Sequence, residues 1–175
     1  SSYIESRGGK WDKSVVFGLQ MFLKEYLTKP ITQEMIDEAE AFWGAHGEPF
    51  NREGWMHILN KHNGYLPVEI QAVPEGTVLP NRNVMLQLVN TDPFVPWLTS
   101  YLETSLLRAI WYPTTVATNS YASKVVIWDA LLESADDPAA EIGFKMHALD
   151  KITVSCNSCG NSVSKVNRSV ESLFD

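Results

Sequence analysis

The chain has 175 residues, of which 45% are hydrophobic and 20% charged, as is ordinary for one soluble globular domain or one domain with an appendage. Its net charge of −7 argues against a general nucleic-acid binder, and no apolar run approaches the roughly 18 residues of a membrane helix. Cys156 and Cys159 are the only cysteines. They do not make a disulfide framework, so we expect a reducing, cytoplasmic compartment.

The N-terminal segment predicts a strand end at Ile4, a Gly-Gly turn and then a helix. Apolar residues recur at helical spacing over 12–28, and Pro30 ends the pattern. Arg7 and Lys10 flank the two glycines. Bare backbone N–H groups and a guanidinium both suit phosphate, so this turn is a candidate anion site, and a solvated turn is the alternative.

Two more helices are predicted before the first full strand. Thr32 is a suitable N-cap for the first of them, and residues 51–62 form the second, which ends at an Asn-Gly pair. His57 and His62 are five positions apart on the second helix. We therefore expect that they do not share a helix face, and we assign neither as a metal ligand.

Residues 66–72 and 84–89 predict two strands, because their apolar side chains alternate with polar ones. Gly76 and Pro80 lie between the two runs and favour a β-hairpin or meander. The flanking helices must cover one face of this sheet. The sequence thus predicts an α/β fold.

The second half of the chain predicts two helices and one strand. An apolar stripe over 95–111, which includes Trp111, indicates packing against the core. Pro113 is expected to break this helix, and a long helix should follow over 114–134. Residues 143–147 are interpreted as the start of another strand.

A search for catalytic motifs finds no nucleophile elbow, Walker A sequence, dinucleotide fingerprint or H-E-x-x-H sequence. Residues 156–160 read C-N-S-C-G, which is half of a typical zinc site formed by Cys156 and Cys159. Zn²⁺ needs four ligands, so a histidine, a second chain or residues beyond Asp175 would have to complete it. A free dithiol is the alternative.

Several short segments occur in an order that is specific to one family. They are residues 3–9, 17–20, 67–70, 73–76, 90–93, 97–99, 102–104 and 111–120. Together they resemble nicotinamide phosphoribosyltransferase in its bacterial and phage form. The resemblance covers residues 1–147, and residues 148–175 form a divergent tail with the lone C-x-x-C pair.

This resemblance implies an enzyme that makes nicotinamide mononucleotide and pyrophosphate from nicotinamide and phosphoribosyl pyrophosphate in NAD salvage. It also implies a type II phosphoribosyltransferase: a dimer with active sites at the subunit interface, built from an N-terminal α/β region and an α/β barrel. Mg²⁺ would accompany phosphoribosyl pyrophosphate, and no cofactor would be tightly bound. The chain corresponds to the N-terminal region, so we expect an incomplete fragment that is inactive alone.

The resemblance also assigns three substrate-binding residues and no catalytic one. Arg7 matches an arginine that reaches phosphate groups across the dimer, and Lys145 and His147 match positions that line the nicotinamide pocket and its tunnel. Polar residues at a strand end are the alternative reading of Lys145 and His147. The family continues with Asp-Phe-Gly-x-Arg-Gly after His147, whereas residues 148–151 read A-L-D-K.

Two alternatives stand beside the transferase. The chain could be a catalytically inactive module that dimerises or is completed by another chain. Alternatively, residues 151–168 resemble the opening of a zinc knuckle in phage homing endonucleases, as if a transferase gene were interrupted after His147. A fragment would leave apolar faces uncovered, so we expect it to associate with another chain or copy.

Overall fold

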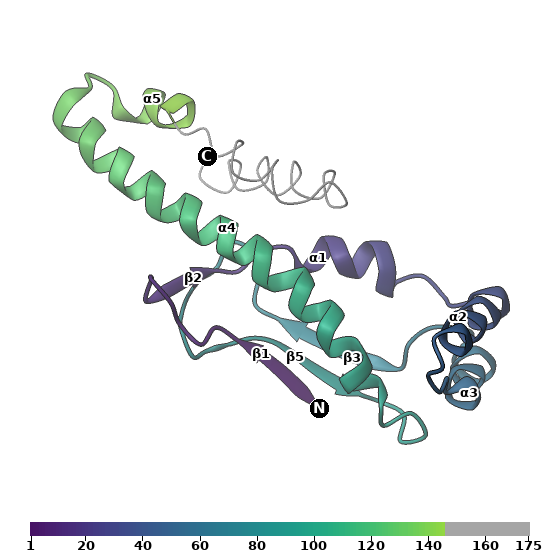
Figure 1. Ribbon diagram of the computed structural model, residues 1–175. Coiled ribbons are helices and arrows are strands. Elements are labelled where there is room, and N and C mark those ends of the chain that lie inside the picture. The colour runs from purple at the N-terminus through teal and green to yellow at the C-terminus, as the bar shows by residue number, and fades with distance from the viewer. Residues whose placement is uncertain (146–175) are drawn as a thin grey trace. The chain divides into compact units, whose positions relative to one another are not determined.

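The computed structural model describes residues 1–145, which contain both helices and strands, as the predicted α/β class requires (Figure 1). These residues divide into two compact units. The first unit contains Ser1–Ile4, Leu19–Ala72 and Leu86–Leu106, and the second contains Glu5–Gly18, Val73–Met85 and the residues from Leu107 onward. Within the described residues, no helix has both the length and the apolar composition needed to cross a bilayer.

The sheet of the first unit has the strand order β1-β5-β3. Its strands are β1 (Ser2–Glu5), β3 (Val68–Ala72) and β5 (Val84–Asn90). β3 and β5 pair antiparallel, as the two alternating runs predict. Gln87 is exposed between the buried Leu86 and Leu88, because successive side chains of a strand point to opposite faces.

Three helical segments belong to the first unit. α1 (Leu19–Phe22) continues into a π-helical turn, η1 (Leu23–Leu27), and α2 (Gln33–Ala45) lies beside α3 (Arg52–His62) (Figure 1). The Thr32 hydroxyl accepts a hydrogen bond from the Met35 amide at 3.3 Å, and the Asn51 side chain accepts one from the Gly54 amide at 3.1 Å. Both N-caps therefore begin the helices where the sequence predicts them.

The core of the first unit lies between the sheet, α3 and the first turns of the helix α4, which begins at Leu98. Ile58 of α3 and Leu98 are fully buried there. The buried members of this core are Leu19, Ile36, Trp55, Ile58, Leu86, Leu88, Val95, Leu98, Leu102 and Leu106. Burial of such aliphatic side chains is the main force that joins the helices to the sheet.

The second unit contains a two-stranded sheet that the sequence did not predict. β2 (Lys13–Val15) pairs antiparallel with β4 (Val78–Pro80), so the expected helix over 12–28 is wrong in its first part. A short apolar run suits a buried strand as well as a helix. The connection between β3 and β5 is consequently more than a turn, because it carries β4.

The long helix α4 (Leu98–Ser134) runs without interruption through Pro113, so the predicted break there is wrong. A proline removes one amide donor and crowds the carbonyl four residues earlier, here that of Ala109. The neighbouring backbone at Gly18 has no side chain, and this leaves room for the proline ring. The helix therefore accommodates Pro113 because the proline ring packs against the glycine backbone.

The apolar stripe of α4 is narrower than the sequence indicated. Trp111 is 57% exposed and Tyr101 is 52% exposed, so the assignment of Trp111 to the core is wrong. The buried positions recur every four residues: Leu98, Leu102, Leu106 and Ile110. Trp111 follows directly after the last of these and points away from that row.

The last described element, α5 (Pro138–Lys145), is a helix, so residues 143–145 do not begin a strand. The Asp137 carboxylate accepts a hydrogen bond from the Ala140 amide at 3.2 Å. This bond and the proline at the first helical position explain the helix start. His147 and the whole tail lie outside the described residues.

Candidate functional site

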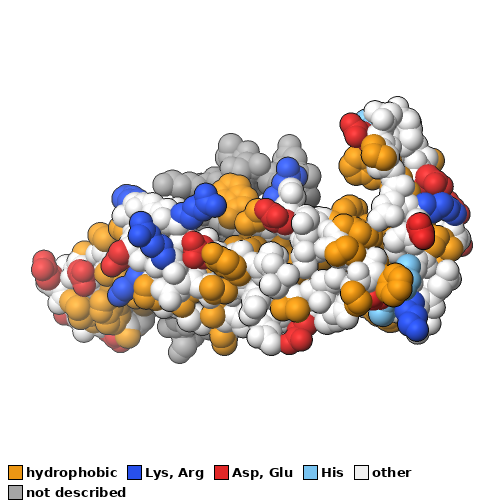
Figure 2. Space-filling model, turned by 90° about the horizontal axis from the view of Figure 1, so that it is seen from below, with side chains coloured by type: hydrophobic (Ala, Val, Ile, Leu, Met, Phe, Trp, Pro, Cys, Tyr) orange, Lys and Arg blue, Asp and Glu red, His pale blue; other side chains and the backbone are white. Residues whose placement is uncertain are grey.

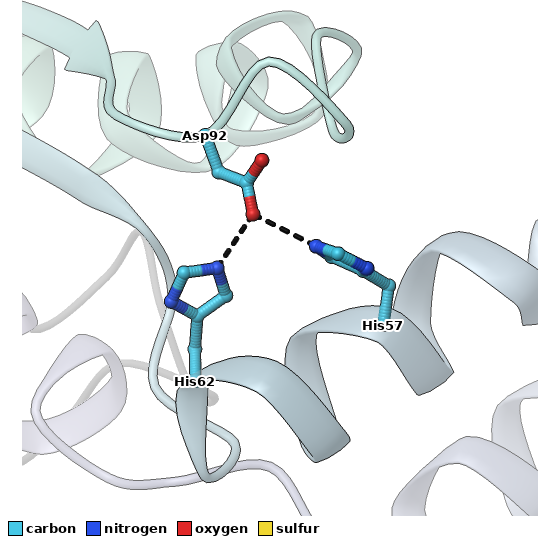
Figure 3. A group of neighbouring side chains, drawn as sticks. All are labelled: His57, His62 and Asp92. Carbon is cyan, nitrogen blue, oxygen red and sulfur yellow. Dashed lines mark hydrogen bonds and ion pairs between the residues drawn. The ribbon is translucent and has the colours of Figure 1, made fainter.

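Three polar side chains of the first unit meet beside the C-terminal end of α3 (Figure 3). His57 Nε2 lies 2.8 Å from Asp92 Oδ2, and His62 Nε2 lies 2.6 Å from the same oxygen. Each ring donates to the carboxylate. We call these three residues the His-Asp-His cluster.

The cluster exists because Asp92 lies over the end of α3, between the two rings (Figure 3). His57 and His62 are separated by about 140° around a helix that turns about 100° per residue. Their long side chains nevertheless reach one oxygen, and His62 is the last residue of α3 before the left-handed Asn63. The two histidines thus lie on different faces of the helix, as their spacing predicts, but Asp92 brings both rings to one oxygen.

The loop after β5 fixes the carboxylate of Asp92. Its Oδ1 accepts a hydrogen bond from the Phe94 amide at 2.9 Å. The Asn90 side chain accepts from the Asp92 amide at 3.2 Å and donates to the Asp92 carbonyl at 2.7 Å and to the Val95 carbonyl at 3.2 Å. One carboxylate oxygen thus holds the loop, and the other is left for the histidines.

Hydrogen bonds also set the charge of the cluster. Donation from His62, from the Phe94 amide and from His57 holds the pKa of Asp92 well below its usual range. The side chain of Asp92 is 10% exposed, whereas those of His57 and His62 are 27% and 29% exposed. A buried anion therefore lies behind two rings that solvent can reach.

His57 is held on its other side by an aromatic contact. Its ring stacks on Phe94, with 5.1 Å between the ring centroids.

The sequence signal for this cluster was the pair of histidines on a short helix together with the Asn-Thr-Asp-Pro exit of the strand. It was missed because spacing along one helix does not show what a distant loop brings to it.

The structure places Arg7 in the second unit, on an exposed turn immediately after β1. The Ser6 hydroxyl donates to the Asn81 side chain at 2.9 Å, and the Arg82 amide donates to the Ser6 carbonyl at 2.8 Å. These bonds bring the backbone of a second exposed arginine beside Arg7. Lys10 instead lies over the ring of Trp11, 4.7 Å from its centroid.

Lys145 is exposed at the end of α5, where its Nζ lies 3.6 Å from the Glu141 carboxylate. It is therefore a helical residue and not a strand-end one. Lys145 belongs to the second unit, whereas the His-Asp-His cluster belongs to the first. His147, Cys156 and Cys159 lie outside the described residues.

Two of the comparisons with known proteins name the same enzyme, nicotinamide phosphoribosyltransferase. Residues 1–70 match the family described as nicotinamide phosphoribosyltransferase, N-terminal domain. The nicotinamide phosphoribosyltransferase of Xanthomonas campestris pv. campestris is 49% identical over 145 residues, which cover 83% of this chain and 31% of that protein. That of Acinetobacter baylyi is 34% identical over 124 residues, which cover 65% of this chain and 24% of the relative.

A solved structure, that of human nicotinic acid phosphoribosyltransferase, aligns with a TM-score of 0.48 and 20% identity over 67% of this chain and 21% of the human one. The chain spans less than a third of the length of either bacterial relative.

Proposed function

We propose, from the premise that this chain belongs to the N-terminal part of the nicotinamide phosphoribosyltransferase family, that it contributes to the synthesis of nicotinamide mononucleotide. The reaction joins nicotinamide to phosphoribosyl pyrophosphate and releases pyrophosphate. The observation that carries the proposal is the 49% identity over 145 residues to a relative named for this activity. Mg²⁺ would accompany the phosphoribosyl pyrophosphate.

The proposed role of the turn after β1 is to hold phosphate groups. Arg7 is exposed, and the amide of Arg82 is bonded to the residue that precedes it. Two guanidinium groups on adjoining backbone suit an anion with several oxygens, because charge-assisted hydrogen bonds are the strong ones. We accordingly assign Arg7 to pyrophosphate binding, and we propose Arg82 as a second residue that binds the same group.

Lys145 and His147 are proposed to approach the nicotinamide. Lys145 would have to leave Glu141 to do so, since the two side chains form an ion pair in the structure. An exposed ion pair of this kind contributes little, so its opening is not an obstacle.

We propose that the 175-residue chain is inactive alone. Orientation of two substrates and stabilisation of developing charge require many placed groups, and the relatives are more than three times as long as the matched segment. Residues of α4 and α5 also expose large apolar side chains: Leu107, Trp111, Val125, Val126, Leu132 and Phe144. Figure 2 shows hydrophobic side chains scattered among polar ones on the surface seen from below.

We propose that this apolar surface is covered by the part of the enzyme that the relatives have beyond the matched segment. The proposed complete form is a homodimer. A contiguous exposed apolar surface marks an interaction site. The proposed location is the cytoplasm, since two cysteines in 175 residues do not form the disulfide framework of a small secreted domain.

The experiment measures nicotinamide mononucleotide made from nicotinamide, phosphoribosyl pyrophosphate and Mg²⁺. The purified 175-residue chain should give none, while the full-length Xanthomonas relative serves as the active control. A chimera in which this chain replaces the matching part of that relative should be active. Product from the 175-residue chain alone, or an inactive but folded chimera, would contradict the proposal.

The role of Arg7 is tested in the same chimera. Arg7→Ala should lower kcat/KM for phosphoribosyl pyrophosphate at least about tenfold, because a hydrogen bond to a charged group is worth about 1.5–3 kcal/mol. Arg7→Lys should recover part of it, and Lys29→Ala, which removes an exposed charge elsewhere, should change nothing. An unaltered kcat/KM in Arg7→Ala would remove Arg7 from the site.

A further inference from the structure

We propose that His57, His62 and Asp92 bind a divalent transition-metal ion, with Zn²⁺ as the ion of choice. Their ligand atoms, two imidazole nitrogens and one carboxylate oxygen, all lie within 4.8 Å of one another (Figure 3). They come from α3 and from the loop after β5, and all belong to the first unit. The inference does not depend on the transferase function.

The distances in the cluster are close to those of a metal site. Zn²⁺ lies about 2.0–2.2 Å from histidine nitrogens and carboxylate oxygens, so tetrahedral ligand atoms are separated by about 3.3 Å. The two nitrogens now lie 2.8 Å and 2.6 Å from the carboxylate oxygen. Separation of the side chains by about half an ångström would admit the ion. Rotation of the partly exposed rings can supply this movement without a shift of the backbone.

The kind of ligand selects the kind of ion. Two imidazoles and one carboxylate suit Zn²⁺, Co²⁺, Ni²⁺ or Cu²⁺, whereas Mg²⁺ and Ca²⁺ prefer oxygen ligands alone. The ion proposed for this cluster is therefore different from the Mg²⁺ that would accompany phosphoribosyl pyrophosphate. Three protein ligands leave a fourth position that water can fill from the exposed side.

The surroundings of the cluster support it as a site. The Phe94 amide already fixes the second oxygen of Asp92, as outer partners do for a ligating carboxylate. The ring of His57 is oriented by its stacking on Phe94. A bound ion would join the end of α3 to the loop after β5 more strongly than two hydrogen bonds do. It should therefore stabilise the folded chain against heat.

The test removes competing ligands first. Cys156→Ser and Cys159→Ser eliminate the C-x-x-C pair of the tail, and this double variant is the reference protein. Co²⁺ is titrated into it while visible absorption is followed, and Zn²⁺ then displaces the Co²⁺ to give a Kd. One equivalent of ion should bind per chain, with a rise in Tm.

Variants of single ligands locate the ion. His62→Gln and His57→Gln should each weaken Zn²⁺ binding by at least about tenfold, since even outer-shell changes cost 10–100-fold. The matched control is His46→Gln: His46 is exposed in the same unit, and its ring hydrogen-bonds to the Phe42 carbonyl and lies against the Phe42 ring. Its affinity should equal that of the reference.

Two further measurements separate a lost ligand from a lost fold. Far-UV circular dichroism without metal should be the same for all variants. Asp92→Asn removes the carboxylate ligand but keeps an acceptor for the Phe94 amide, so the loop after β5 stays bonded. In the reference protein, Zn²⁺ should shift the side-chain ¹⁵N resonances of His57 and His62 and leave those of His46 unchanged. Equal affinity in folded His62→Gln, or no shift of the His57 and His62 resonances, would overturn the proposal.

Discussion

A side chain added at Gly18 would place its Cβ 2.5 Å from the Cβ of Pro113 in α4. The same atom would lie 2.9 Å from the Ala109 carbonyl oxygen, and Gly18 has a φ of +102°. Pro113 lacks the amide that would bond that carbonyl within the helix. The glycine therefore lets the connection between β2 and α1 pass close to the turn of α4 that contains Pro113.

The first prediction follows from this contact. Gly18→Ala should lower the free energy of unfolding by at least about 2 kcal/mol, because a positive φ and a backbone clash act together. Urea denaturation measures it. Gly44→Ala is the control: a Cβ there meets nothing within 4 Å, and helix propensity should raise stability by up to about 1 kcal/mol. Equal stabilities of Gly18→Ala and the wild type would contradict the packing.

The second prediction concerns a hydroxyl group of α4 that accepts a hydrogen bond from the backbone of β2, as the carbonyl of a neighbouring strand would. The Thr118 hydroxyl accepts from the Val15 amide at 2.9 Å and donates to the Thr114 carbonyl at 2.6 Å. Thr118→Val keeps the shape and leaves a buried amide without an acceptor. It should cost about 1–3 kcal/mol of the free energy of unfolding.

Thr115→Val is the control for this variant, because the Thr115 hydroxyl is exposed and bonds only the Trp111 carbonyl within the described residues. Its effect should stay within about 0.5 kcal/mol. Chemical denaturation compares the two. If both variants lose the same stability, the hydrogen bond from the Val15 amide to Thr118 does not stabilise the packing of β2 on α4.

Those hydroxyl bonds also show why sequence reading succeeded for some elements and failed for others. Thr32 and Asn51 begin helices through bonds to residues three positions away, and such local signals are visible in the sequence. The partners of Val15 are Val78 and Thr118, which lie far along the chain. Its place in a strand is decided by these distant partners, and periodicity cannot reveal them.

The same reasoning applies to the candidate site. Arg7 was proposed from its place beside two glycines and from a resemblance between whole segments, and neither signal requires a contact to be foreseen. His57 and His62 were seen in the sequence but judged by their spacing along one helix. Only the path of the loop after β5 brings Asp92 to both of them. Convergence of three side chains from two elements is a tertiary property.

The third prediction tests the core of the first unit. Ile58 is fully buried among the sheet and helices, so Ile58→Ala should lower the free energy of unfolding by about 2–5 kcal/mol. Val126→Ala removes an apolar side chain that is 68% exposed on α4 and should change stability by no more than about 0.5 kcal/mol. A loss below about 1 kcal/mol for Ile58→Ala would mean that α3 is not packed as described.

The fourth prediction concerns an ion pair between α2 and α3. The Arg52 guanidinium lies 2.7 Å from the Asp37 carboxylate, and the Gln33 side chain donates to the same oxygen at 2.9 Å. Arg52, and then Gln33, hold the pKa of Asp37 below its usual value. A carboxyl with a lowered pKa contributes stability above its unfolded pKa of about 3.9 and loses it as the pH falls through the folded value.

Arg52→Gln should therefore raise the pKa of Asp37 towards its usual value, as measured by NMR titration of the side-chain carboxyl. Glu34 is an internal control in the same spectra. Its pKa is lowered by a backbone hydrogen bond and by the Thr32 side chain, neither of which involves Arg52; the charge of Asp37 acts on it only as the smallest cause, so it should move much less than that of Asp37. Because the pair is exposed, added salt should reduce the difference between wild type and Arg52→Gln. An Asp37 pKa that is the same in both proteins would show that Arg52 does not hold α2 against α3 in solution.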